Sequence, residues 1–192
     1  EIDERGRREE RQHALQRVRE EVWHMRSRGG IQHVLDAIRE GLTSLTVPFQ
    51  RCRMYVVEAR LGAENVRVYT RGDVESWSSV PLEDSSWRDV ILGVWRDGVP
   101  AYRADIEETD RVFETSGSQQ PVTIRSVLDV PFSHGALSID SDRPQAFSDA
   151  DIAVLQEMAG ALSEGFHRLE DLQKLAEERQ RLAVTLRSIG DC

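Results

Sequence analysis

The sequence predicts an α+β domain in which an antiparallel sheet packs against helices, with coiled-coil helices flanking the domain at both ends. Two pairs of strand-like runs lead to this prediction: residues 53–59 with 66–70, and residues 123–132 with 135–140. Only a short gap separates the members of each pair, which is typical of hairpins. Segments with apolar residues at helical spacing lie before, between and after the pairs. Hairpin strands with helices collected on one side define the α+β class.

The first element is a predicted helix over residues 1–28, in which Arg and Glu surround a short apolar stripe. A stripe of barely more than one heptad is marginal on its own, so we expect it to form a dimer interface. Trp23 lies beside the stripe and is expected in the dimer interface or in packing within a helix bundle. Ser27–Gly30 break the helix. The stripe consists of Leu15, Val18, Val22 and Met25.

The middle of the chain alternates helical and strand-like patterns, with Gly, Pro and Ser between them. The two hairpins described above belong to this part. The other predicted elements are a helix over 31–45 that stops near Val47 and Pro48, a strand or loop over 77–82, a helix over 87–95 that is capped by 84–86 and ended by Gly98, a strand over 99–103, and a surface loop or short helix over 107–120.

The last element is a predicted helix that starts at Ser148, with Asp151 three residues later in a capping-box-like arrangement. No proline interrupts residues 152–189, and a pattern of this length suggests a coiled coil. Its apolar repeat changes phase, so we expect a stutter near residues 169–172. The expected dimer contacts of this helix are Leu169, Leu172, Leu175, Leu182, Leu186 and Ile189.

Composition excludes several classes of function. The 192 residues carry a formal net charge of −9, and the acidic excess lies in residues 29–167, which argues against a nucleic-acid partner. No apolar run reaches the ~20 residues of a membrane span, and the charged N-terminus is no signal peptide. The cytoplasm is therefore the expected location. The chain does not begin with Met, so we expect a fragment of a longer protein.

Residues Ile124 to Phe166, IRSVLDVPFSHGALSIDSDRPQAFSDADIAVLQEMAGALSEGF, resemble the C-terminal half of a GAF domain, a small sensory module of signalling proteins. Two strands joined by a turn lead to a helix start with Phe147, Ser148 and Asp151, as in that family. The segment WRDVILGVWRDGVPAYRAD resembles the family's central helix and following strand. The resemblance covers Gly30 to Leu169.

The resemblance implies a domain organisation as well as a fold. It implies a signalling and dimerisation helix over 1–28, a sensory domain over 29–167 and a coiled-coil linker over 168–192. The tail LAVTLRSIGD is similar to the entry into a PAS domain. A histidine kinase, a cyclic-dinucleotide enzyme or a similar output domain would then follow.

The resemblance implies that aromatic side chains surround the sheet face, central helix and loop that would enclose a GAF pocket, and small-molecule pockets are mostly apolar. The same spacing is also typical of plain core packing, so both interpretations stay open. Arg53, Arg103 and Arg125 lie in or beside strands and would suit an anionic ligand if they pointed inward; otherwise they form a solvated face. The candidate ligand residues are Trp77, Trp87, Ile91, Trp95, Tyr102, Phe113 and Phe132.

No catalytic or metal site is expected. Cys52 and Cys192 are the two cysteines; they are too few for a disulfide framework, and a thiol-dependent reductase needs more than one cysteine nearby. The histidines show no metal-ligand spacing, and no Gly-rich phosphate loop is present. Bilin-binding relatives attach the pigment through a cysteine that is often followed by histidine; here Ser133 precedes His134, so no covalently bound cofactor is expected.

The sequence therefore predicts a homodimeric sensory module that binds a small molecule, is not itself an enzyme, and passes a signal along its flanking helices. Such helices can carry a signal as a choice between two discrete packings. Two rivals remain: a ligand-free structural dimerisation spacer, and an enzyme, either a thiol-dependent reductase or a hydrolase.

Overall fold

The computed structural model describes residues 2–60, 63–71, 77–82, 86–106 and 124–190. Its elements follow the predicted order of helices and strands. They are α1 (Ile2–His24), η1 (Arg28–Gly30), α2 (Ile31–Ser44), β1 (Arg51–Arg60), β2 (Ala63–Arg71), β3 (Trp77–Leu82), α3 (Ser86–Asp97), β4 (Ala101–Arg103), β5 (Ser126–Phe132), β6 (Gly135–Ser141) and α5 (Asp149–Gly190).

The strands form one sheet with the order β3-β2-β1-β6-β5-β4, and each of its pairs is antiparallel. Both predicted hairpins are present: β1 pairs with β2, and β5 pairs with β6. Residues 77–82, expected as a strand or a loop, form an edge strand that pairs with β2. The α+β fold class is confirmed. Residues 107–120, expected as a loop or short helix, lie in a segment outside the described residues.

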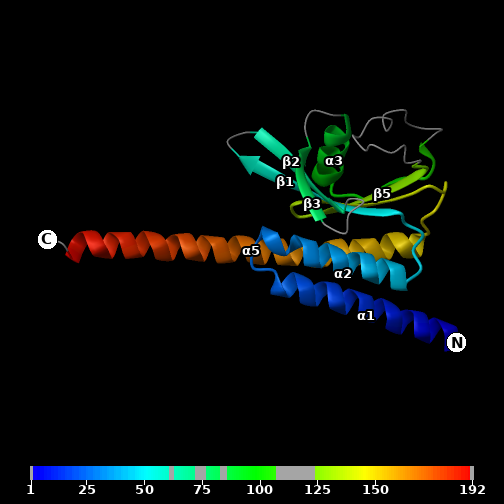
Figure 1. Cartoon of the computed structure of the whole chain (residues 1–192), viewed down its shortest axis with the longest axis horizontal. Coiled ribbons are helices and arrows are strands. Elements are labelled where there is room, and N and C mark those ends of the chain that lie inside the picture. The colour runs from blue at the N-terminus through cyan, green and yellow to red at the C-terminus, as the bar shows by residue number, and fades with distance from the viewer. Residues whose placement is uncertain (1, 61–62, 72–76, 83–85, 107–123, 191–192) are drawn as a thin grey trace.

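Helices cover both faces of the sheet unequally. The helices α1, α2 and α5 lie together on one side, and α3 lies on the other (Figure 1). Because side chains of a strand alternate between faces, Cys52 and Met54 of β1 join the larger core under the three helices, whereas Tyr55 and Val57 join the smaller core under α3. The smaller core lies between α3 and the sheet.

The long helix α5 begins with the predicted cap. The Asp151 carboxylate accepts hydrogen bonds from the Ser148 backbone N–H at 2.8 Å and from its hydroxyl at 2.7 Å. The Asp151 N–H donates in return to Ser148 Oγ at 3.3 Å. From Asp149 to Leu169 the helix packs on the sheet, and Leu169 is its last buried residue among those described. Beyond it, α5 extends alone and exposed (Figure 1).

The apolar stripe of α1 is buried within this single chain. Leu15, Val18, Val22 and Met25 belong to the core that α1 shares with α2 and α5. The sequence predicts these residues in a dimer interface, but in the structure their contacts are intramolecular. Gly165 of α5 allows this contact, because a glycine without a Cβ lets the Val22 side chain of α1 approach closely.

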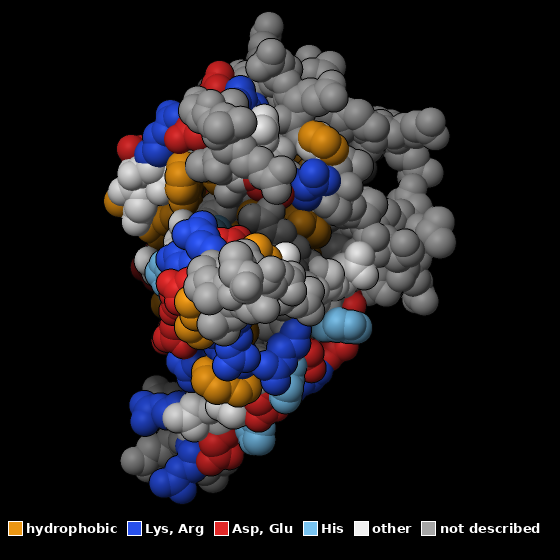
Figure 2. All heavy atoms as spheres, turned by 90° about the vertical axis from the view of Figure 1, so that its left-hand side faces the viewer, with side chains coloured by type: hydrophobic (Ala, Val, Ile, Leu, Met, Phe, Trp, Pro, Cys, Tyr) orange, Lys and Arg blue, Asp and Glu red, His pale blue; other side chains and the backbone are white. Residues whose placement is uncertain are grey.

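Trp23 remains 65% exposed, with the Arg168 guanidinium 4.1 Å from its ring centroid. Basic and acidic side chains intermingle around a few hydrophobic ones over the helices, in the view from the end where α5 protrudes (Figure 2). Among the described helices, none combines the length and apolar character that crossing a membrane would require.

Candidate functional site

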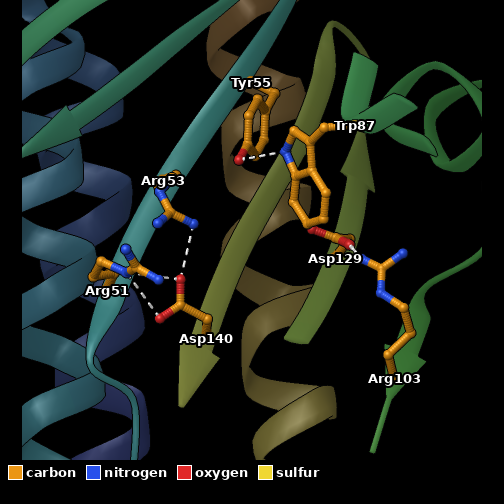
Figure 3. A network of polar contacts seen from close by, with 7 residues as sticks. All are labelled: Arg51, Arg53, Tyr55, Trp87, Arg103, Asp129 and Asp140. Carbon is orange, nitrogen blue, oxygen red and sulfur yellow. Dashed lines mark hydrogen bonds and ion pairs between the residues drawn. The ribbon is translucent and has the colours of Figure 1, made fainter. Parts of the chain in front are cut away.

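A cluster of buried polar side chains lies on the α3 face of the sheet (Figure 3). The central strands β1, β6 and β5 place Arg53, Ser138 and Asp129 opposite one another in register. Asp129 and Asp140 are both fully buried. Charged residues are rarely buried completely unless they are paired, so the partners of these two carboxylates define the site.

Asp140 holds two arginines of the neighbouring strand. Arg51 Nε lies 3.1 Å from both carboxylate oxygens of Asp140, and Arg53 Nη1 lies 2.8 Å from Oδ2. The side chains of Arg51 and Arg53 are only 24% and 17% exposed. Two guanidinium groups thus converge on one carboxylate near the start of β1.

Asp129 pairs with Arg103 of β4, and an aromatic pair lies above the two. The Trp87 indole N–H of α3 donates to the Tyr55 hydroxyl at 2.7 Å, and the two ring centroids are 6.1 Å apart. The Arg103 guanidinium lies 5.2 Å from the Trp87 ring centroid, within cation–π range. Trp87 of α3 therefore contacts both Tyr55 of the sheet and the Arg103 guanidinium that pairs with Asp129 (Figure 3).

Burial sets the electrostatics of this cluster. It raises the pKa of Asp129 above the ordinary range of a carboxyl group, an effect that the Arg103 guanidinium opposes. Burial also raises the pKa of Tyr55 to about 12, with the Arg53 charge acting in the opposite direction. Perturbed titratable groups gathered in one place are a common property of functional sites.

The predicted ligand residues divide between the two faces of the sheet. Trp87 and Ile91 are buried on the α3 face, and Trp95 packs beside them. Tyr102 and Phe132 instead belong to the core under α5, with rings against Phe147 and Phe166 respectively. Strand alternation separates them from Trp87, so the set does not line one pocket. The Trp77 side chain and all of Phe113 lie outside the described part of the chain.

The three arginines singled out in the sequence point inward and are paired. Arg53 contacts Asp140, Arg103 contacts Asp129, and Arg125 makes a two-point pair with Asp105 at 3.0 and 2.7 Å. Sequence reasoning missed the acidic partners Asp129 and Asp140. The available signal was an acid at an inner position of a strand that is apolar on both faces, as in SVLDVPF.

The β5–β6 turn joins this face to α5. The Trp95 indole of α3 donates to the Ser133 carbonyl oxygen at 3.1 Å, and the Ser133 N–H donates to Ser163 Oγ of α5 at 2.9 Å. His134 Nε2 lies 2.9 Å from a carboxylate oxygen of Glu170, also on α5. Hydrogen bonding to His134 lowers the pKa of Glu170, and burial opposes this. The turn thus contacts helices on both sides of the sheet.

Cys52 lies on the other face, away from the polar cluster. It is buried in the core under α1, α2 and α5, and burial raises the pKa of its thiol to about 12. A thiol that keeps its proton is a poor nucleophile. Cys192 falls outside the described residues. Within the described ranges, no group of three His, Cys, Asp or Glu side chains is placed to hold a metal ion.

Solved structures that resemble this chain share a GAF-like fold. A GAF domain from an Acinetobacter phosphoenolpyruvate-protein phosphotransferase has 18% identity and a TM-score of 0.58, with 83% of this chain and 93% of that one covered. The corresponding GAF domain from Coxiella burnetii has 12% identity and a TM-score of 0.60, with coverages of 85% and 96%. The fold of this chain is therefore GAF-like.

The same fold also occurs in an enzyme. The free methionine-R-sulfoxide reductase from Neisseria meningitidis, solved with its substrate, has 16% identity and a TM-score of 0.60, with 84% of this chain and 91% of that one covered. Neither a family profile nor a curated protein sequence matches this chain. At these identities the resemblance shows the fold alone.

Proposed function

We propose that this domain is a regulatory sensory module that binds a small molecule on the α3 face of its sheet and passes the signal along α5. The observation that carries the proposal is the cluster of buried charges under α3. Asp129 and Asp140 are fully buried on this face, and the Arg53 side chain beside Asp140 is only 17% exposed.

Burying an ion pair is a costly way to stabilise a sheet. Desolvation of two charges can exceed their mutual attraction, and apolar replacements are often neutral or stabilising by about 1–4 kcal/mol. The pairs Arg103–Asp129 and Arg53–Asp140 therefore contribute little to folding that Val or Leu could not supply. Convergent polar groups beside aromatic side chains are, however, what orients a small ligand. Ligand binding accounts for their presence on this face.

The route to the output follows the β5–β6 turn. A ligand that displaces Trp87 moves α3, and Trp95 on the same helix is hydrogen-bonded to Ser133. Ser133 and His134 in turn contact Ser163 and Glu170 of α5. Because α5 is one helix up to Gly190, a change in its packing on the sheet reaches its protruding end.

The protruding part of α5 supports a homodimer. Leu172, Leu175 and Leu182 are 38%, 55% and 64% exposed, and the last two are seven residues apart. Leucines at this spacing pair in parallel coiled coils. The side chains of Leu186 and Ile189, which continue the repeat, lie outside the described part. We infer that α5 carries the dimer interface and leads to a PAS-like domain and an output domain in the cytoplasm.

The dimer has a direct test in sedimentation. Replacing both Leu175 and Leu182 by Glu is expected to convert a dimer into a monomer. The matched control replaces Gln173 and Gln180, which are exposed on α5 outside this repeat, by Glu. A double Leu variant that sediments as the wild-type protein does would contradict the interface.

A ligand-free dimerisation spacer is the second candidate function. The observation that favours it is that Arg103 pairs with Asp129, and Arg125 with Asp105, without a ligand. An enzyme of the thiol-dependent class is disfavoured because Cys52 is buried on the opposite face with a raised pKa. We therefore propose no catalytic role for this domain.

A thermal-shift screen against fractionated cell extract and a library of small metabolites tests the sensory proposal. A true ligand is expected to raise the melting temperature of the wild-type protein and of Asp89→Asn, an exposed carboxylate on α3. The same ligand is expected to lose its effect on Asp129→Asn. Should Asp129→Asn not fold, Tyr55→Phe takes its place. Equal shifts in all variants, or no shift by any fraction, would favour the spacer.

A further inference from the structure

The charges around Asp140 are unbalanced. Elsewhere on this face Arg125 lies against Asp105, and Arg103 lies against Asp129. Arg51 and Arg53, in contrast, share the single carboxylate of Asp140 among the described residues. Arginine keeps its charge at every physiological pH. Arg51, Arg53 and Asp140 together therefore carry one positive charge in excess, and their side chains are largely buried from water.

One atom of this group lacks a partner. Arg51 uses Nε toward both oxygens of Asp140, and its Nη2 is buried without a hydrogen bond among the described residues. A buried donor without an acceptor is uncommon in folded proteins and calls for an explanation. An uncompensated charge at the same place adds to the cost. Both deficits disappear if an oxyanion accepts from Arg51.

We propose that Arg51 and Arg53 form the anion subsite of the small-molecule site, and that the ligand carries a carboxylate or a phosphate group that binds there. This inference rests on the proposed function. The planar guanidinium offers paired N–H donors that match either group. Asp140 keeps its role of holding both arginines, because Arg53 Nη1 remains at 2.8 Å from it.

The geometry also selects the size of the ligand. The subsite lies on the same face of the sheet as Tyr55 and Trp87 (Figure 3), and these two aromatic side chains are themselves buried in the core under α3. The side chains of Arg51 and Arg53 are both mostly buried. A nucleic-acid backbone or a protein surface would therefore not reach their guanidinium groups. A compact organic acid or phosphate ester is the class that fits.

Inorganic phosphate and acetate are the probes for the test, each titrated against chloride at constant ionic strength. The melting temperature of the wild-type protein is expected to rise saturably with at least one probe, and the probe that acts distinguishes a phosphate ligand from a carboxylate ligand. In Arg51→Met the apparent affinity is expected to fall at least tenfold. Arg51→Lys, which keeps the charge without the fork, is expected to lie between the two.

The matched control is Arg96→Gln, which removes an exposed arginine of α3 that pairs with Glu64. It is expected to respond as the wild-type protein does. A response that is unsaturable, or equal in wild type and Arg51→Met, would overturn the subsite. A neutral ligand that co-purifies with the protein while neither anion has an effect would overturn the subsite and leave the sensory function standing. Failure of the sensory function itself would show as no bound ligand of any kind.

Discussion

Two glycines of α5 allow a matched test of how α1 packs. A Cβ at Gly165 would lie 2.2 Å from Val22 Cγ1 of α1, well inside van der Waals contact. A Cβ at Gly160 meets nothing within 4 Å. The substitution Gly→Ala therefore makes the same chemical change twice on one helix, once against α1 and once in open space.

The two substitutions are expected to change the free energy of unfolding differently. Alanine in a helix interior is favoured over glycine by about 1 kcal/mol, so Gly160→Ala is expected to stabilise the protein by about that amount. Gly165→Ala gains the same propensity but crowds Val22, and overpacking costs about 1–3 kcal/mol. The net effect is between neutral and about 2 kcal/mol destabilising, and the two variants differ by about 1–3 kcal/mol.

Urea denaturation at fixed protein concentration measures the free energies of unfolding. Adding Val22→Ala completes a double-mutant cycle, in which the Gly165→Ala penalty is expected to disappear because the clash is removed. Should Gly165→Ala stabilise the protein as much as Gly160→Ala does, α1 would not lie against α5 at this point, and the intramolecular burial of its stripe would be refuted.

Three further predictions concern the sheet. Gly135→Ala places a Cβ 1.8 Å from the Tyr55 carbonyl oxygen, and is expected to destabilise the protein by about 3 kcal/mol or more in thermal or urea unfolding; a cost no larger than that of Gly93→Ala would count against the hairpin register. In a Cys192→Ser background, Cys52 is expected to resist maleimide at pH 8 until urea is added, since burial raises its pKa to about 12; rapid native labelling would contradict its position. Because burial raises the pKa of Tyr55 from 10.0 to about 12, the native state keeps a proton that the unfolded chain loses, and stability is expected to fall as pH rises from 10 to 12. Tyr55→Phe should lose less stability than wild type over that range, and parallel stability curves would disprove the buried phenol.

The sequence predicts the secondary structure well because local signals determine it. Strand-like runs separated by a short gap define both hairpins, and the side chains of Ser148 and Asp151 fix the start of α5 as a cap. Gly98, with φ of +66°, ends α3 where the pattern places the end of that helix. These features depend on neighbours a few residues apart, which a sequence shows directly.

Packing partners are less readable from a sequence. The stripe of α1 has the spacing of a dimer interface, yet its contacts are α2 and α5 of the same chain. An apolar stripe shows that a face is buried, but not which surface buries it. The stutter predicted near residues 169–172 stays a prediction, although burial along α5 ends at Leu169.

The site itself was only partly predictable. The inward alternative for Arg53 and Arg103 is the arrangement that the structure has, but their partners Asp140 and Asp129 are distant in sequence and come together only through the strand register. The sequence predicts Tyr102 in one site with Trp87 because both are aromatic. Strand parity places Tyr102 on the opposite face, against Phe147.

Native mass spectrometry of protein purified directly from cells, compared with its denatured mass, tests the central claim most directly. A ligand on the α3 face predicts a dimer with a stoichiometric extra mass that is absent from Asp129→Asn and retained in Asp89→Asn. A dimer without added mass, at every ligand concentration supplied, would contradict the sensory function and leave the spacer. A monomer would remove the route through paired α5 helices.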